Sequence, residues 1–274
     1  MSTTSYHTEK TDSKSYSSGY DVFLKRTDFR EKVLSYFKES FPIELKSCKK
    51  IKVLDLGCGD GAMTKLYLEA LGEISGSLEV DLYLLEPAQN ALKSASIKVK
   101  NLAKSVNEIN LTADEYFSRP SEQTFDLVIA SYVFYHIAPS IIPELTRRLS
   151  SKGAMAIMMG SRNHPLRAHP DLRLVSKHGD SDILLAPLEE ANKSQGLSVA
   201  RSNLKTEVDL KGLWNSDNGF TEEGNQFFSF IYNTDISEFP EKSTEALKSV
   251  LSSVLASEAG IIHPVHEFIW LEKY

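Results

Sequence analysis

Few cysteines and no long apolar run are the first features of this 274-residue sequence. Its two cysteines, Cys48 and Cys58, lie close together, and Cys58 sits in a glycine-rich loop, so we expect a reducing compartment and no disulfide framework. No stretch approaches the roughly 18 apolar residues of a membrane span, and residues 1–19 lack the apolar segment of a secretion signal. These absences predict a cytoplasmic protein with no membrane contact.

The sequence also lacks an excess of basic residues. It contains 31 Lys and Arg against 37 Asp and Glu, which gives a formal net charge of −6. No run of Lys and Arg is interleaved with aromatic residues, a pattern that would follow a phosphate backbone. A small molecule is therefore a more plausible partner than nucleic acid. The sequence leaves the oligomeric state open, with a monomer favoured.

Short apolar runs alternate with helical patterns along the middle of the chain. Strands are predicted at 51–56, 80–85, 106–111, 125–130 and 154–159, with helices at 63–71, 89–99 and 141–149. Gly72 and the segment Ser151-Lys152-Gly153 are expected to stop the first and last of these helices. This alternation builds a parallel sheet covered by helices on both faces.

The flanks of this core are less regular. The polar residues 1–19 are expected to form a flexible tail, and one or two helices follow from Tyr20 to near Pro42. Residues 20–274 are interpreted as one domain with insertions at about 161–240, of which 161–182 is irregular. Further helices are predicted at 183–195, 214–232 and 241–256, a strand region at 197–210, and a last, antiparallel strand at 267–273, at or near the sheet edge.

Glycines occupy alternate positions between the first strand and the first helix, in Asp55-Leu56-Gly57-Cys58-Gly59-Asp60-Gly61. Glycine accepts a positive φ and lets a ligand approach the backbone, and the helix beyond offers unpaired N–H groups. Glu86 ends the second strand, where its carboxylate could accept two ribose hydroxyls or cap the next helix. Together these residues predict an adenosine cofactor, but Gly57, Gly59 and Ala62 also fit the dinucleotide fingerprint of NAD enzymes.

Three ordered motifs resemble the class I S-adenosylmethionine-dependent methyltransferases. They are Asp55-x-Gly57-x-Gly59-x-Gly61, Glu86-Pro87 and Phe125-Asp126-Leu127-Val128-Ile129-Ala130, and the resemblance covers residues 53–159. It implies a Rossmann-like α/β fold with a mostly parallel seven-stranded sheet, helices on both faces and the last strand antiparallel. It also implies S-adenosyl-L-methionine as the cofactor.

The resemblance also implies which residues hold this cofactor. Asp55 and the glycines would meet the methionine part, Glu86 the ribose, and the turn at Asp114 the adenine, although Asp114 could equally cap a short helix toward Phe117. The full set of cofactor-binding candidates is Asp55, Gly57, Gly59, Asp60, Gly61, Glu86, Pro87, Thr112, Ala113, Asp114 and Ser131.

Aromatic residues follow the fourth strand in Ser131-Tyr132-Val133-Phe134-Tyr135-His136. Ligands of an open parallel sheet bind beyond the carboxyl ends of its strands. Tyr132 and Tyr135 are therefore candidate walls of an acceptor pocket that favours a cationic amine, and His136 is a candidate proton acceptor. A packed or capping role is the alternative for His136. In-line methyl transfer depends mainly on alignment and on exclusion of water, so no catalytic dyad is required.

Residues 20–45 and the insertions after Gly160 lie where this fold commonly adds a lid. The helix that starts at Tyr20, the pair Glu86-Pro87 and the ending Glu267-Phe268-Ile269-Trp270-Leu271 are also similar to histamine N-methyltransferase. That similarity implies an amine acceptor held by an acid of the lid, Asp28 or Glu31, each of which could instead be an ordinary surface residue. Tyr20 is a further substrate candidate, and Trp214 could cover the pocket or only pack.

The histidines of the irregular segment, His164, His169 and His178, match no zinc-binding spacing, so no metal site is predicted. The sequence therefore predicts N-methylation of a small amine. It leaves O- or C-methylation, an NAD-dependent oxidoreductase and a catalytically silent cofactor-binding protein as alternatives.

Overall fold

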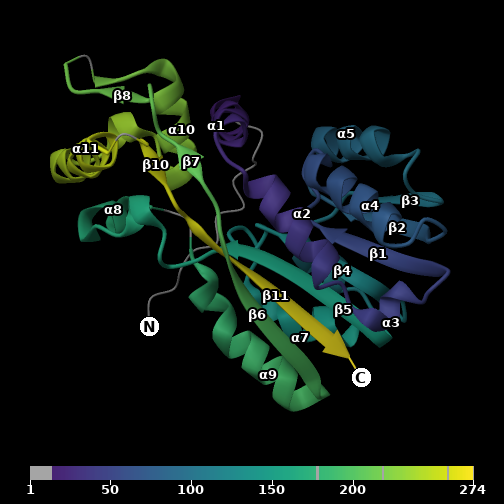
Figure 1. Ribbon diagram of the computed structural model, residues 1–274. Coiled ribbons are helices and arrows are strands. Elements are labelled where there is room, and N and C mark those ends of the chain that lie inside the picture. Colours follow the sequence, from purple (N-terminus) through teal and green to yellow (C-terminus); the bar gives the residue numbers. More distant parts are fainter. Residues whose placement is uncertain (1–13, 177–178, 218, 258, 274) are drawn as a thin grey trace.

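The computed structural model describes residues 14–176, 179–217, 219–257 and 259–273. Its frame is a seven-stranded sheet with the order β3-β2-β1-β4-β5-β11-β6 (Figure 1). The first five strands are parallel neighbours: β1 (Lys50–Leu56), β2 (Glu79–Leu85), β3 (Ser105–Ile109), β4 (Phe125–Ser131) and β5 (Leu149–Gly160). β11 (Val265–Lys273) runs antiparallel to both β5 and β6 (Leu197–Lys205). The predicted Rossmann-like sheet is confirmed, and its antiparallel strand lies one position inside the edge.

Two hydrophobic clusters cover the two faces of this sheet because successive side chains of a strand point to opposite sides. Ile51 and Val53 of β1 belong to one cluster, and Leu54 and Leu56 belong to the other. Helices α2 (Phe29–Glu39), α4 (Ala62–Ile74) and α5 (Gln89–Val99) pack on the first face. Helices α6 (Ala113–Phe117), α7 (Ile142–Arg147) and α9 (Leu185–Gln195) pack on the second. The short α3 (Ile43–Lys46) leads from α2 into β1.

A second group of elements stands beside the sheet, and we call it the cap (Figure 1). It consists of α1 (Lys14–Lys25), α8 (Pro170–Val175), α10 (Glu222–Tyr232), α11 (Glu241–Leu255), the strand pair β7 (Val208–Asp209) with β10 (Ile261–Ile262), and the hairpin of β8 (Trp214–Asn215) with β9 (Gly219–Phe220). Short 3-10 helices are η1 (Pro139–Ile141), η2 (Pro165–Arg167), η3 (Ser181–Leu184) and η4 (Ile236–Glu238). No helix in the described ranges is both long and apolar enough to cross a membrane.

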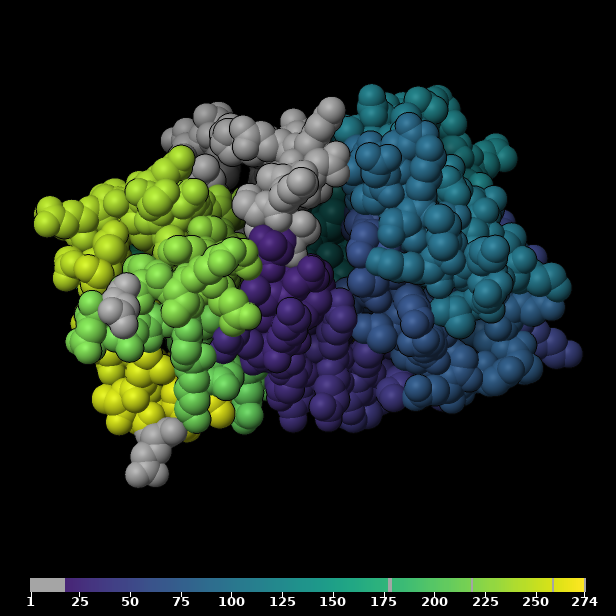
Figure 2. Space-filling view, turned by 90° about the horizontal axis from the view of Figure 1, so that it is seen from above, coloured from purple at the N-terminus to yellow at the C-terminus, as the bar shows by residue number. Residues whose placement is uncertain are grey.

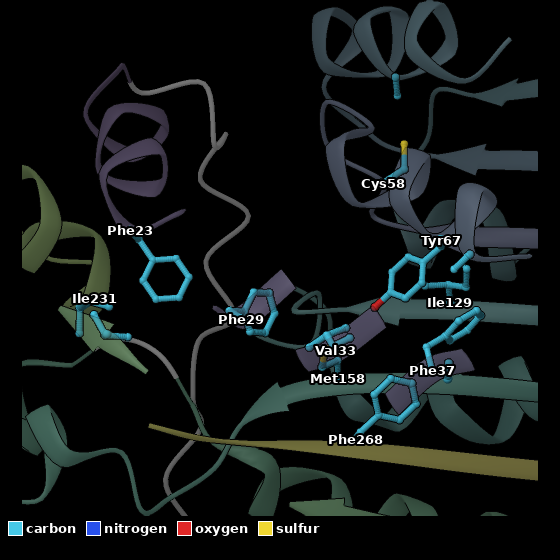
Figure 3. Packing of buried hydrophobic residues seen from close by; sticks show 14 of the residues in the cluster. Phe23, Phe29, Val33, Phe37, Cys58, Tyr67, Ile129, Met158, Ile231 and Phe268 are labelled. Atoms are coloured by element: carbon cyan, nitrogen blue, oxygen red, sulfur yellow. The ribbon is translucent and has the colours of Figure 1, made fainter. Parts of the chain in front are cut away.

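The N-terminal helices join the cap to the sheet. Helix α1 approaches α10 closely, because a Cβ on Gly19 would lie 2.4 Å from the carbonyl oxygen of Gln226. Figure 2 shows these purple N-terminal residues between the green and yellow C-terminal part and the blue and teal sheet. One hydrophobic cluster continues through all three parts, and Figure 3 labels members on the cap side (Phe23, Ile231), at the junction (Phe29) and on the sheet side (Val33, Phe37, Met158, Phe268).

Several predicted boundaries are wrong where tertiary pairing overrides local signals. Helix α4 continues past Gly72 to Ile74. The segment Ser151-Lys152-Gly153 lies inside β5, because Leu149 already pairs with Phe125 and a register shift accommodates the extra residues. The strand region 197–210 breaks between β6 and β7.

The helix predicted at 214–232 begins only at Glu222. The β8–β9 hairpin comes before it, with Gly219 at a φ of +77°, and the Thr221 hydroxyl accepts the N–H of Gly224 at 3.1 Å as the N-cap. At the other end of the chain, α1 begins at Lys14, inside the segment predicted as a tail. Residues 1–13 lie outside the described residues, so the division into a tail and one domain stays a prediction.

Two glycines of α4 make a matched test of this fold. Gly61 caps the helix with a φ of +79°, and a Cβ there would lie 2.5 Å from Cα of Ala95, whereas a Cβ on the helical Gly72 would meet nothing within 4 Å. We expect Gly61→Ala to lower the free energy of unfolding by about 2–4 kcal/mol. Gly72→Ala should raise it by about 0.5–1 kcal/mol. Urea denaturation measures both, and equal effects would contradict the assigned backbone.

Candidate functional site

The glycine loop lies at the carboxyl end of β1, with each of its three glycines in the left-handed region. The φ values are +68° for Gly57, +54° for Gly59 and +79° for Gly61. A Cβ on Gly57 would lie 2.4 Å from Cγ2 of Val133, and one on Gly61 would strike Ala95 of α5. A Cβ on Gly59 would meet nothing within 4 Å. Packing therefore requires glycine at positions 57 and 61, whereas Gly59 faces open space that a ligand can occupy.

Glu86 lies against this loop from the end of β2. Its side chain is buried, Oε2 accepts the N–H of Gly59 at 3.1 Å, and Oε1 accepts the N–H of Ala88 at 3.0 Å. The side-chain amide of Asn110 donates to the carbonyl oxygens of Glu86 and Pro87 at 3.0 and 2.9 Å, which fixes the turn after β2 to the end of β3. The carboxylate thus meets both the glycine loop and the start of α5. Ribose binding by Glu86 stays a prediction.

Asp55 and Asp60 serve the loop in different ways. The carboxylate of the buried Asp55 accepts a hydrogen bond from the Thr64 hydroxyl of α4 at 2.6 Å. Its pKa is raised to about 7, mainly by burial; the hydrogen bond from Thr64 opposes this rise, and the nearby Glu86 adds to it. Asp60 is exposed, accepts the N–H of Ala62 at 3.1 Å and pairs with Lys98. Asp55 therefore anchors α4 under the loop, while Asp60 lies at its outer rim.

The N-terminal helices α1 and α2 carry side chains that interact electrostatically with this rim. Burial raises the pKa of Tyr20, and the guanidinium of Arg30 beside it and the carboxylate of Asp60 act on the same hydroxyl. Tyr20 comes from α1 and Arg30 from α2, so the interaction of these two side chains joins the two helices. A role of Tyr20 toward a substrate stays a prediction.

The turn predicted to contact adenine opens α6. Thr112 is its N-cap, since the hydroxyl accepts the N–H of Glu115 at 3.2 Å and Glu115 accepts the N–H of Thr112 at 2.8 Å. The short helix toward Phe117 is confirmed, but a capping role for Asp114 is wrong. Asp114 is exposed and Ala113 is buried, and their contact with adenine stays a prediction.

The aromatic turn after β4 lies directly beside the glycine loop through the contact between Val133 and Gly57. Tyr132 has a φ of +57°, which is unusual for a residue with a side chain and holds its ring against that of Tyr135, with centroids 5.9 Å apart. The hydroxyl of Tyr135 accepts the N–H of Gly160 at 2.9 Å. The two tyrosines predicted to wall a pocket are therefore brought together at the carboxyl ends of β4 and β5, with Ser131 at the end of β4.

His266 of β11 completes this cluster and was not predicted. Its Nδ1 is hydrogen-bonded to the Tyr132 hydroxyl, and its Nε2 lies 3.0 Å from the hydroxyl of Thr206, which donates to the carbonyl of Pro264 at 3.4 Å. This direction makes Nε2 the protonated nitrogen, so Tyr132 donates to Nδ1. Burial, with the nearby Arg167, lowers the pKa of His266 to about 3. His266 therefore stays neutral and orients Tyr132.

The other predicted residues lie at different places. His136 is half-buried in the turn after β4, its N–H donates to the carbonyl of Val133 at 2.9 Å, and burial lowers its pKa. Asp28 accepts the N–H of Glu207 at 2.7 Å and lines a surface groove of about 500 Å³, and Glu31 is exposed. Trp214 lies in β8, and its buried Nε1 has no partner among the described residues. Their roles toward a substrate stay predictions.

The histidines of the irregular segment serve as local caps. Nδ1 of His164 accepts the N–H of Leu166, and Nδ1 of His169 accepts that of Asp171, each at 3.3 Å. His178 lies outside the described residues. Within the described part of the chain no group of three or more His, Cys, Asp or Glu side chains is arranged to hold a metal ion.

Asp55 gives a prediction for the dependence of stability on pH. An unfolded Asp ionises near 3.8, whereas the folded carboxyl keeps its proton to about pH 7. The folded state binds more protons between these values, so this group's stabilisation is lost as the pH rises from about 4 to about 7. Asn cannot titrate, so the free energy of unfolding of Asp55→Asn should rise relative to that of the wild type by roughly 2–4 kcal/mol between these pH values. Urea denaturation at several pH values checks this, with the exposed Asp21→Asn as control; parallel curves would contradict it.

Comparison with known proteins gives a family for the strands and helices around the glycine loop. Residues 54–154 match a family model described as a methyltransferase domain. An uncharacterized protein from Haemophilus influenzae is 29% identical over 125 residues, which cover 44% of this chain and 46% of that protein. The match thus spans less than half of the length of that relative.

Solved structures agree with the fold at lower sequence identity. The YcgJ protein of Bacillus subtilis has a TM-score of 0.53 at 14% identity, over 87% of this chain and 98% of that one. A candidate methyltransferase from Bacillus halodurans C-125 has a TM-score of 0.51 at 15% identity, over 84% and 96%. The part of the chain that matches the methyltransferase domain, residues 54–154, thus lies within a sheet that has the Rossmann-like methyltransferase fold.

Proposed function

We propose that this protein transfers the methyl group of S-adenosylmethionine to a small molecule, by N-methylation of an amine. The observation that carries the proposal is the contact between two loops. The glycine loop with Glu86 meets the aromatic turn after β4 where Val133 packs on Gly57. A cofactor bound by the first loop would present its methyl group to an acceptor bound by the second.

The residues of the first loop fit this cofactor. Gly59 borders open space, and the buried Glu86 carboxylate lies beside it at a distance of 3.1 Å from the Gly59 nitrogen. When bound, S-adenosylmethionine supplies a methyl group attached to a positively charged sulfur. Glu86 would accept the ribose hydroxyls, and the backbone N–H groups at the start of α4 would meet the polar methionine end.

The aromatic turn suits an amine more than a hydroxyl acceptor. Burial raises the pKa of both Tyr132 and Tyr135, so both stay protonated and neither supplies a phenolate base. Because the Tyr132 hydroxyl donates its hydrogen bond to His266, its oxygen can still accept a hydrogen bond from an N–H of the acceptor. The faces of the aromatic rings attract a cationic or partly charged amine when it binds. Once the amine is unprotonated, its lone pair can attack the methyl group without a strong base. His136, whose pKa burial lowers, is the candidate to take the proton released.

The oxidoreductase alternative is disfavoured by the sheet. A dinucleotide-binding fold has the parallel strand order 3-2-1-4-5-6. Here the antiparallel β11 lies between β5 and β6, although the glycine pattern alone would admit NAD. A cytoplasmic location, a monomeric state and the absence of nucleic-acid partners stay proposals based on composition.

The proposal is tested by incubation with methyl-labelled S-adenosylmethionine and a panel of amines, phenols and carboxylic acids. Label should appear on amines. Transfer to phenols alone would overturn the N-methylation assignment. Cofactor binding without transfer to any member would favour a silent binding protein. NAD binding without S-adenosylmethionine binding, measured by calorimetry, would overturn the proposal as a whole.

Glu86 gives a sharper test of the cofactor site. Glu86→Gln keeps the shape and one acceptor oxygen but removes the charge, so we expect S-adenosylmethionine to bind about 10- to 100-fold more weakly. Glu79→Gln is the matched control, because Glu79 begins the same strand but is exposed and pairs with Lys104 at 2.9 Å on the surface. Calorimetric titration measures both. Equal affinities for Glu86→Gln and the wild type would remove Glu86 from the ribose site.

A further inference from the structure

Arg167 is a buried cation beside the aromatic turn. It ends the short helix η2, only 9% of its surface is exposed, and Nη1 donates to the carbonyl of Gly179 at 3.3 Å. Its Nε is buried without a hydrogen-bond partner among the described residues. No carboxylate of these residues lies within 4.0 Å of the guanidinium, although the exposed Arg162 of the same segment pairs with Asp182.

The groups around Arg167 are almost all neutral. The hydroxyls of Tyr132, Tyr135 and Tyr232 and the imidazole of His266 all feel its charge, and burial keeps each of them uncharged. The carboxylate of Asp180 acts electrostatically on one member of this group, because it helps to raise the pKa of Tyr135. A buried cation without a direct counterion is costly, and a hydrogen-bonded anion lowers that cost. The environment therefore favours an anionic ligand.

The position of Arg167 connects it with the acceptor site. Both Nη2 of Arg167 and the hydroxyl of Tyr135 lie beside Gly160. A Cβ added to Gly160 would be 3.1 Å from Nη2 and 2.9 Å from the hydroxyl. Gly160 ends β5, next to β4 in the sheet, and Tyr135 packs on Tyr132. The guanidinium thus belongs to the same end of the sheet as the proposed acceptor pocket, where ligands of such sheets bind.

We propose that Arg167 binds a carboxylate of the methyl acceptor, so that the acceptor carries both an amine and a carboxylate, as amino acids do. The inference rests on the proposed methyltransferase function and adds the substrate class. A guanidinium presents N–H groups in a planar fork that matches the two oxygens of a carboxylate. The amine would lie at Tyr132, beside the cofactor loop, and the carboxylate at Arg167, beyond the end of β5.

The test compares acceptors that differ only in the carboxylate: histidine with histamine, and phenylalanine with phenethylamine. Binding to the protein loaded with S-adenosylhomocysteine is measured by calorimetry, and methyl transfer is measured as kcat/KM. We expect at least one acid to bind about 10- to 100-fold more tightly than its amine partner, the range of a charge-assisted hydrogen-bonded pair. Arg167→Met should abolish this preference, and Arg167→Lys should reduce it.

Arg162→Met is the matched control, since Arg162 lies five positions earlier in the same segment and its guanidinium is exposed. It should keep the preference. Thermal melting and S-adenosylhomocysteine affinity report whether each variant folds, and the comparison within the wild type does not depend on any variant.

The possible results separate the two proposals. If no acid is preferred over its amine in the wild type, or if folded Arg167→Met keeps the preference, the carboxylate assignment is overturned. If an acid binds through Arg167 but receives no methyl group, the binding site stands and the proposed function fails. If amines are methylated without regard to a carboxylate, the function stands and this inference fails.

Discussion

The close contact between Gly57 and Val133 is the constraint on which the rest of the site depends. A single Cβ at position 57 would lie 2.4 Å from the Val133 side chain, so only glycine lets the loop after β1 meet the turn after β4. This contact brings two separate chemistries together at one end of the sheet: the loop that fits an adenosine cofactor and the aromatic turn that fits an acceptor. The N–H of Gly57 donates to the carbonyl of Leu85 at 2.8 Å, which ties the end of β2, and with it Glu86, to the same point.

Burial determines the charges around this contact. Asp55 has its pKa raised to about 7, His266 has its pKa lowered to about 3, and Tyr132 and Tyr135 stay protonated. Neutral side chains on the acceptor side suit a reaction in which a positively charged methyl donor meets an uncharged nucleophile, because such a reaction needs alignment and exclusion of water more than acid–base groups. Arg167 differs from these side chains because its guanidinium brings a positive charge to the acceptor side. Its charge is therefore the feature that can discriminate between acceptors.

The sequence predicts the parts of this site that are local in the chain. The glycine loop, the acid at the end of β2 and the aromatic turn each occupy a few consecutive residues whose spacing reflects one strand and one turn, and α5 has the bounds expected of it. The mostly parallel seven-stranded sheet with its antiparallel last strand also follows from the alternation of elements and the family resemblance. What cannot be predicted is set by tertiary contacts. Gly72 reads as a helix stop but lies inside α4.

His266 and Arg167 show why the proposed acceptor site is harder to predict from the sequence than the proposed cofactor site. His266 is 134 positions away from the tyrosine that it orients, and it sits in a strand whose apolar pattern indicates only packing. Arg167 lies in a segment without periodicity, and its guanidinium meets Gly160, the carbonyl of Gly179 and the hydroxyl of Tyr135 only in the folded chain. The proposed cofactor site is built from short motifs, each a few consecutive residues long, whereas the proposed acceptor site lies where β4, β5, β11 and η2 converge. Under this proposal, specificity for the acceptor depends on segments that only the folded chain brings together.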